Sequence, residues 1–232
     1  MAEIVCTVGP KTIPHLKDIV AKGVGLFRLN GSFGIPDIAY LRKFSHPILL
    51  DIPGRRKKGV SHNLTDEELV DLAIKREIDY IGMSYVRNAE EVKRMRDYIK
   101  EKGGNTKIVA KIETKEAVEN AKEIIDASDM VLIDRGDLGT DIGFEKVPHY
   151  QKEIIRQCNE KGKKVIVATE MMMSTIKSDK PNCADVSDVY HAVQSGSDFV
   201  MLSEETAQGD EPVKTIEIMR KIIDFSKTQK NK

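Results

Sequence analysis

Residues 108–134, with the sequence IVAKIETKEAVENAKEIIDASDMVLID, hold two short apolar runs on either side of an amphipathic stretch. The runs at residues 108–112 and 130–134 carry β-branched side chains, as buried strands do. Residues 115–127 between them place apolar side chains at helical spacing. The stretch therefore predicts a strand, a helix and a second strand, the unit from which parallel sheets are built.

The same unit recurs along the chain. Further strand candidates lie at residues 4–8, 25–29, 47–51, 80–84, 164–168 and 199–202. Helical patterns follow at residues 12–22, 65–76, 89–102, 147–161, 184–196 and 212–227, with a shorter and weaker one at 35–44. The helix at 65–76 opens with a capping pattern, Thr65 followed by Glu68.

Eight strand–helix units in 232 residues predict an α/β fold, a single (β/α)8 TIM barrel that spans residues 1–232 as one domain. An open, doubly wound sheet is the competing architecture. It is disfavoured because Gly9, Pro10, Lys11 and Thr12 after the first strand do not form the glycine-rich nucleotide turn GxGxxG.

Composition excludes several classes of protein. The chain is 40% hydrophobic, too high for a disordered protein, and its 37 basic and 37 acidic residues give a net charge of zero. No apolar run approaches the roughly 20 residues that span a bilayer. We expect no nucleic-acid or membrane partner. The three cysteines lack CxxC spacing and the N-terminus lacks a secretory pattern, so we expect a cytoplasmic protein.

Polar residues stand at almost every predicted strand end. In a barrel these ends face the active site, and side chains two positions apart share one face of a strand. Burying so many polar groups at one rim is costly unless they pair with each other or bind a ligand. The groups concerned are Arg28, Asn30, Asp51, Ser84, Lys111, Glu113, Arg135, Asp137, Thr169, Ser203, Glu204 and Glu205.

Lys111 and Glu113 form the strongest local pair, because their spacing places an ammonium beside a carboxylate. Glu113 and Asp137, on what we expect to be adjacent strands, offer two hard oxygen ligands suited to Mg²⁺ or Mn²⁺. The simpler interpretation is a Lys–Glu salt bridge at the rim. The convergence of Asp137, Arg28 and Asp51 on the same rim favours the site.

Arg28 and Asn30 repeat this spacing on the second strand. An arginine there can grip a carboxylate or phosphate through its planar fork, or simply pair with Asp51 on the next strand. Gly136, before Asp137, lets the backbone approach a ligand closely. The basic run at residues 55–58 is more typical of a solvated loop, although its place on this rim leaves a phosphate role open.

These strand ends resemble the pyruvate kinase family over almost the whole chain. The order and spacing of the motifs are far more specific than any one of them. The most specific motifs are Ala110-Lys111-Ile112-Glu113, Arg135-Gly136-Asp137-Leu138-Gly139, Ala168-Thr169-Glu170-Met171 and Met201-Leu202-Ser203-Glu204-Glu205-Thr206-Ala207. Others are Ile4–Pro10, Arg28–Ser32 and Met83–Arg87.

The resemblance implies roles for the matching residues. Glu113 and Asp137 would hold a divalent metal, Mg²⁺ or Mn²⁺. Lys111 would be catalytic and would stabilise an enolate or a transferring phosphoryl group. The backbone around Gly136 and Asp137, together with Thr169, would hold the substrate carboxylate.

The resemblance also implies sites for phosphate and for a monovalent cation. Arg28 would face phosphoryl oxygens and take part in binding and catalysis. Asn30, Ser32 and Asp51 match positions that help to bind the monovalent ion. Ile52 replaces a threonine that helps to hold this ion, which counts against potassium binding.

Other departures concern the nucleotide half of the site. The family inserts a lid domain after the third strand, whereas here residues 51–55 lead through a short loop to the helix at Thr65, so we expect no lid. We also expect no C-terminal regulatory domain. Phe33 replaces a His, Lys58 an Arg, Glu170 a Gln and Glu204 a Gly.

We therefore expect a metal-dependent enzyme that acts on pyruvate, phosphoenolpyruvate or a related 2-oxo acid through a Mg²⁺-stabilised enolate. Lyase, decarboxylase, enol-transfer and phosphoryl-transfer outcomes stay open. One alternative is a minimal pyruvate kinase that transfers the phosphoryl group of phosphoenolpyruvate to ADP. Another is a non-catalytic metabolite-binding protein. We expect a homo-oligomer, because such barrels commonly associate.

Overall fold

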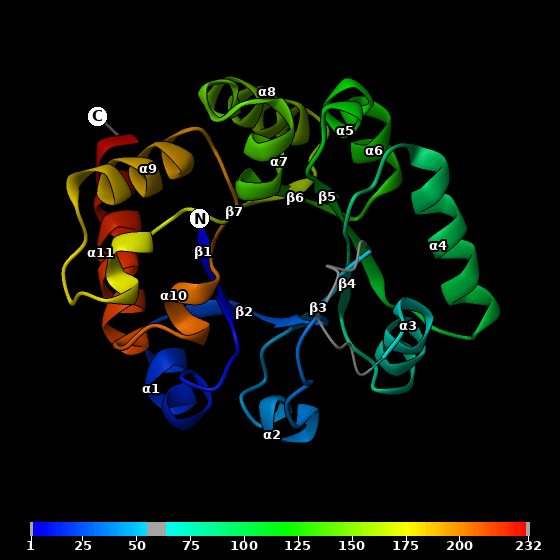
Figure 1. Cartoon of the computed structure of the whole chain (residues 1–232), viewed down its shortest axis with the longest axis horizontal. Coiled ribbons are helices and arrows are strands. Elements are labelled where there is room, and N and C mark those ends of the chain that lie inside the picture. The colour runs from blue at the N-terminus through cyan, green and yellow to red at the C-terminus, as the bar shows by residue number, and fades with distance from the viewer. Residues whose placement is uncertain (1, 55–63, 231–232) are drawn as a thin grey trace.

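The computed structural model describes residues 2–54 and 64–230. In this part of the chain, eight parallel strands close into a barrel in sequence order (Figure 1). They are β1 (Glu3–Thr7), β2 (Val24–Asn30), β3 (Ile48–Ile52), β4 (Tyr80–Met83), β5 (Lys107–Ile112), β6 (Met130–Asp134), β7 (Lys164–Ala168) and β8 (Phe199–Leu202). The predicted (β/α)8 barrel is confirmed, and the open sheet is excluded because β1 pairs with β8.

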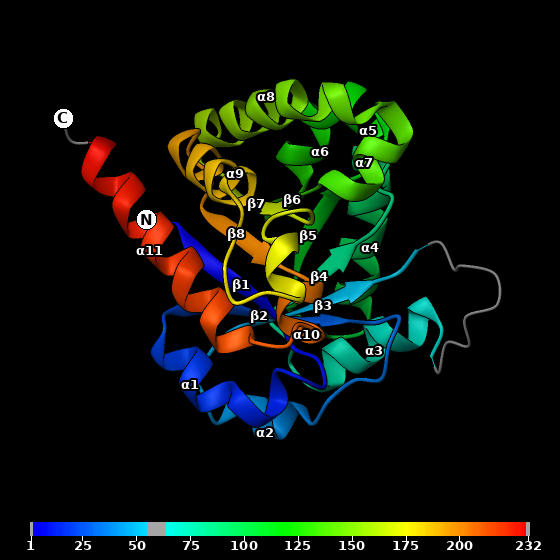
Figure 2. The ribbon, with the colours of Figure 1, turned by 60° about the vertical axis from the view of Figure 1, so that its left-hand side comes forward.

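Helices surround the barrel on its outer side (Figures 1 and 2). They are α1 (Leu16–Ala21), α2 (Ile38–Arg42), α3 (Asp66–Lys75), α4 (Ala89–Glu101), α5 (Lys115–Glu119), α6 (Ala121–Ala127), α7 (Arg135–Ile142), α8 (Val147–Glu160), α9 (Cys183–Gln194), α10 (Glu204–Ala207) and α11 (Pro212–Lys230). None of the described helices combines the length and apolar character needed to cross a membrane.

Two differences from the predicted elements affect the site. The predicted helix 115–127 is interrupted at Asn120, whose side-chain amide donates to the Arg87 carbonyl at 2.9 Å. The short helices α7 and α10 were not predicted. Each begins within two residues of the end of a strand, so the chain turns into a helix at the rim itself.

The apolar core has two shells. The larger shell lies between the strands and the surrounding helices. The smaller one fills the barrel interior with side chains such as Val5, Leu26, Leu49, Val109 and Leu132. This inner cluster fills the barrel below the rim, and in barrels of this kind ligands bind at the carboxyl ends of the strands.

Candidate active site

Strand alternation carries charged side chains from the apolar interior to the rim. In β5, Val109 belongs to the inner cluster, so Lys111, two residues on, points the same way at the carboxyl end. In β2, β3 and β6, a charged residue likewise follows a side chain of the inner cluster by two positions. This alternation yields four charged side chains that are each at least nine-tenths buried: Arg28, Asp51, Lys111 and Asp134.

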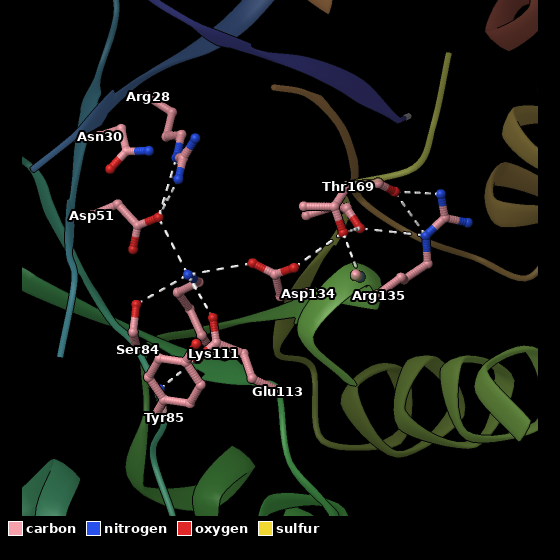
Figure 3. A network of polar contacts seen from close by, with 12 residues as sticks. Arg28, Asn30, Asp51, Ser84, Tyr85, Lys111, Glu113, Asp134, Arg135 and Thr169 are labelled. Atoms are coloured by element: carbon pink, nitrogen blue, oxygen red, sulfur yellow. Dashed lines mark hydrogen bonds and ion pairs between the residues drawn. The ribbon is translucent and has the colours of Figure 1, made fainter. Parts of the chain in front are cut away.

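The ammonium of Lys111 lies at the centre of this group (Figure 3). Its Nζ is 2.6 Å from Glu113 Oε1, 3.3 Å from Asp51 Oδ2 and 3.4 Å from Asp134 Oδ2. It also donates a hydrogen bond to Ser84 Oγ at 3.0 Å. Burial acts to lower the pKa of Lys111, but the three carboxylates outweigh it and raise the pKa above its ordinary value. Lys111 is therefore a fixed positive charge at the rim.

Glu113 is almost completely buried, and its two oxygens have different partners. Oε2 accepts the Tyr85 backbone N–H at 2.5 Å. Oε1 faces Lys111 as an ion pair but accepts no hydrogen bond within the described residues. Burial outweighs the Lys111 charge and, with Asp134 nearby, raises the pKa of Glu113 to about 7. The shared face predicted for Lys111 and Glu113 agrees with this geometry.

Arg28 is tied to Asp51 on the neighbouring strand. Its Nε and Nη2 donate to Asp51 Oδ2 at 3.2 and 2.5 Å, and Nη1 donates to Thr7 Oγ1 at 3.4 Å. Burial raises the pKa of Asp51, but Lys111 and Arg28 outweigh it, and the net shift is downward. Arg28 therefore pairs with Asp51, as the simpler interpretation predicted. The pairing holds the guanidinium at the rim, where it can also bind an anionic group.

The corner between β6 and α7 brings together the residues predicted to hold a substrate carboxylate. Gly136 N donates to Thr169 Oγ1 at 2.9 Å, and that hydroxyl also lies 3.0 Å from Asp134 Oδ1. Arg135 fixes the end of β7, since its Nε donates to the Thr169 carbonyl at 3.0 Å and its Nη1 pairs with Asp188 at 2.6 Å. The N-terminus of α7 faces this corner, where its dipole favours an anion.

Asp137 lies in the first turn of α7 and not on a strand, so the expectation that Glu113 and Asp137 stand on adjacent strands was wrong. The two still converge. One oxygen from each of Glu113, Asp134 and Asp137 falls within 4.8 Å of the others. Three carboxylates, one of them from the buried Glu113, form the hard-oxygen donor set that suits Mg²⁺ or Mn²⁺. The residues present therefore fit a divalent metal.

The residues predicted to bind a monovalent cation lie close together, but one of their oxygens already accepts a hydrogen bond in the turn after β2. Asn30 pairs with Asp51 in the register of β2 and β3. Asn30 Oδ1 accepts the Ser32 backbone N–H at 3.0 Å. Asp51 Oδ1 is buried without a hydrogen-bond partner among the described residues. The Ile52 side chain is buried and offers no oxygen. A monovalent site at Asn30, Ser32 and Asp51 stays a prediction.

Strained backbone gathers at the same rim. Tyr85, Thr169 and Glu170 have φ values of 55°, 61° and 52°, in the left-handed region that residues other than glycine rarely adopt. Tyr85 follows β4, and the other two follow β7. Such strain persists only where surrounding contacts enforce it, and it clusters at functional sites.

A cavity of about 420 Å³ opens beside Arg28. Thr7, Asn30, Ser203 and Glu204 contribute to its lining, and so does Phe33, whose side chain is 62% exposed. The predicted basic loop, Arg55 to Lys58, lies outside the described residues.

Sequence reasoning missed Asp134 and Tyr85 as members of the site, and it placed Arg135 at the rim without giving it a role. The signal for Asp134 was its position two residues after Leu132, which fills the barrel interior. The left-handed backbone of Tyr85, which directs its N–H to Glu113, has no signature in the sequence.

Comparison with known proteins identifies the family. Residues 52–216 match the model of the pyruvate kinase barrel domain. A pyruvate kinase of Dictyostelium discoideum is 42% identical over 161 residues, which cover 68% of this chain and 32% of that protein. One from Methanocaldococcus jannaschii is 36% identical over 186 residues, 75% of this chain and 42% of that protein. One from Staphylococcus aureus is 39% identical over 173 residues, 75% and 30% respectively.

The chain spans less than half the length of each of these relatives, between 30% and 42%. The matched domain nevertheless covers most of the chain, and the closed barrel presents the strand-end motifs at one rim. On this evidence of sequence and architecture, the chain belongs to the pyruvate kinase family.

Proposed function

We propose that this barrel is an enzyme that stabilises the enolate of pyruvate, phosphoenolpyruvate or a related 2-oxo acid, with Mg²⁺ or Mn²⁺ held by Glu113 and Asp137. One observation carries the proposal. A buried, permanently charged Lys111 stands among carboxylates at the rim, directly beside the oxygen donors that fit a divalent metal. The metal, when bound, would polarise the oxo group of the substrate.

The chain's own residues supply the remaining parts. Lys111 keeps its proton and offers positive charge to an oxygen that becomes negative in the reaction. The N-terminus of α7 beside Thr169 suits a substrate carboxylate, which would take over the N–H that Gly136 donates to Thr169 Oγ1 in the free site. Interactions that strengthen as negative charge develops on the enolate oxygen lower the activation barrier most. The Lys111 ammonium is already held in place for that interaction, so it does not have to reorganise during the reaction.

Arg28 supports phosphoenolpyruvate as one of the substrates. Asp51 holds its guanidinium at the rim beside the cavity lined by Ser203 and Glu204. A guanidinium matches the oxygens of a phosphoryl group. This observation also keeps a second candidate, a minimal pyruvate kinase that uses ADP.

We propose that the barrel works without an inserted lid. Residues 53–65 alone join β3 to α3, where the family inserts that domain. Phosphoryl transfer is sensitive to water, so a barrel without that inserted domain favours enolate chemistry over transfer to ADP.

Exchange of the methyl hydrogens of pyruvate for deuterium in D2O tests the proposal, and proton NMR follows it. We expect Mg²⁺-dependent exchange by the wild type and a loss of at least about 100-fold in Lys111→Met and Glu113→Gln, in line with the loss of an electrostatic catalytic group. Lys107→Met is the matched control, because Lys107 is exposed at the opposite end of the same strand. Equal exchange by the wild type and Lys111→Met contradicts the proposal.

A coupled assay with phosphoenolpyruvate and ADP separates the two enzymatic candidates. Pyruvate formation that depends on Lys111 supports the minimal kinase. Exchange of pyruvate hydrogens without turnover of phosphoenolpyruvate supports enolate chemistry on another substrate. If pyruvate binds but both activities are absent, the chain is a metabolite-binding protein.

A further inference from the structure

Asp134 places a third carboxylate where the resemblance implied two metal ligands. Its side chain is 6% exposed and shares the inner face of β6 with Leu132. Oδ2 lies 3.4 Å from Lys111 Nζ, and Oδ1 accepts from Thr169 Oγ1 at 3.0 Å (Figure 3). The carboxylate thus stands between the catalytic lysine and the corner that leads to Asp137.

The distances allow Asp134 to share an ion with its neighbours. Oxygens of Glu113, Asp134 and Asp137 lie within 4.8 Å of one another. Two ligands on opposite sides of one Mg²⁺ are about 4.2 Å apart, at about 2.1 Å from the ion each. Two ligands in adjacent positions are about 3.0 Å apart, so side-chain adjustments of up to about 2 Å would bring all three into one coordination shell.

The charges of the group call for a divalent cation. With every group ionised, the buried carboxylates Asp51, Glu113 and Asp134 outnumber the buried cations Arg28 and Lys111 by one, and the exposed Asp137 adds a second negative charge. Three of these carboxylates are at least nine-tenths buried. An excess of buried negative charge is unfavourable unless a cation joins it.

A second observation points to a ligand at the same place. Glu113 is 1% exposed, and its Oε1 is paired with Lys111 Nζ at 2.6 Å, with no backbone or hydroxyl donor among the described residues. Its other oxygen is held by Tyr85 N, which fixes the direction of Oε1. A carboxylate oxygen has two lone pairs, so one stays available to a metal ion beside the Lys111 ammonium.

We propose that Asp134 is a third protein ligand of the divalent metal, with Glu113 and Asp137, and that the chain therefore binds Mg²⁺ or Mn²⁺ before any substrate arrives. The inference rests on the metal site of the proposed function. An octahedral ion has six positions, so three protein oxygens leave three, enough for two oxygens of a 2-oxo acid and one water.

Binding of Mn²⁺ alone tests this proposal, with the loss of the free-ion signal in electron paramagnetic resonance as the readout. The variants are Asp134→Asn and Asp134→Ser, compared with Glu113→Gln and Asp137→Asn. Asp141→Asn is the control, because Asp141 is an exposed acid one turn further along α7 and its loss removes the same charge. Thermal unfolding without metal shows whether each variant folds.

We expect both Asp134 variants to weaken Mn²⁺ binding as much as Glu113→Gln and Asp137→Asn do, and by more than the roughly 10- to 100-fold that losing an outer partner of a ligand costs. Asp141→Asn should change the affinity less than about twofold, because exposed charges are screened. Mn²⁺ should also raise the thermal unfolding temperature of the wild type and of Asp141→Asn by similar amounts, and that of the Asp134 variants by less.

Two other results overturn the proposal in different ways. If Glu113→Gln and Asp137→Asn lose Mn²⁺ while both Asp134 variants match Asp141→Asn, Asp134 is no ligand and the metal site of the proposed function stands. If the wild type binds no Mn²⁺, or if none of the variants changes its affinity, both proposals fail.

Discussion

At the scale of residues, the site follows from which face of a strand each side chain occupies. Alternation brings Arg28, Asp51, Lys111 and Asp134 inward at one end of the barrel, where ion pairs between them offset the cost of burying charge. Pairs of this kind do not have to add stability, but removing one member leaves a buried charge unbalanced. Asp51 matters most, because it contacts both cations.

Asp51→Asn should lower the free energy of unfolding by about 3–5 kcal/mol, the usual cost of breaking a buried ion pair from one side. Urea denaturation at pH 7 measures it. Asp71→Asn is the control, because Asp71 pairs with Lys102 where both side chains are 47% exposed, and its loss should cost less than about 1 kcal/mol. Equal losses in the two variants would show that the Asp51 network is not energetically coupled.

Two buried thiols predict an alkaline loss of stability. Burial raises the pKa of Cys6 and of Cys158 to about 12, from an ordinary value of 9.0. Above about pH 9 the unfolded thiols ionise while the folded ones do not. Stability is therefore complete below pH 9 and falls as the pH rises toward 12, by up to about 1.4 kcal/mol per pH unit for each thiol.

Urea unfolding at pH 8 and pH 10 checks this effect. Cys6→Ala and Cys158→Ala should each lose about 1 kcal/mol less than the wild type between the two pH values. Comparing the change with pH, and not the absolute stability, removes the cost of the cavity that each substitution leaves. Cys183→Ala, at an exposed thiol, should behave like the wild type. A wild-type slope in all three variants would rule out this linkage.

At the scale of elements, the starts of the helices decide what reaches the rim. Asp137 faces Glu113 because α7 begins directly after β6. The sequence showed the polar residues at this corner but not the helix, since eight residues with two glycines carry little helical periodicity. By contrast, the start of α3 was predicted and is confirmed: Thr65 and Glu68 form the capping box.

Thr65→Ala should destabilise the chain by about 0.5–2 kcal/mol, because it removes the hydroxyl that accepts the Glu68 backbone N–H at 3.2 Å. Thr65→Ser keeps the hydroxyl and should stay close to the wild type. Chemical denaturation of the three proteins measures the difference. If the alanine and serine variants are equally stable, the cap does not anchor α3.

At the scale of the whole molecule, the barrel could be predicted because eight units of the same period leave few other arrangements. The inner and outer faces of each strand were harder to assign. If the start of a strand is misplaced by one residue, the side chains predicted to point inward point outward instead. The inward position of Asp134 therefore follows from the register of β6 in the structure and could not be read from the sequence. The left-handed backbone at Tyr85 and Thr169 results from tertiary contacts and could not be predicted locally.

The central claim is that one rim of this barrel binds a divalent metal and a 2-oxo acid together. A crystal structure with Mn²⁺ and pyruvate, with the metal located by its anomalous scattering, tests it most directly. We predict a manganese peak among Glu113, Asp134 and Asp137, with the pyruvate carboxylate at Gly136 and Thr169. Manganese bound elsewhere, or a rim empty of pyruvate at a saturating concentration, would contradict the account.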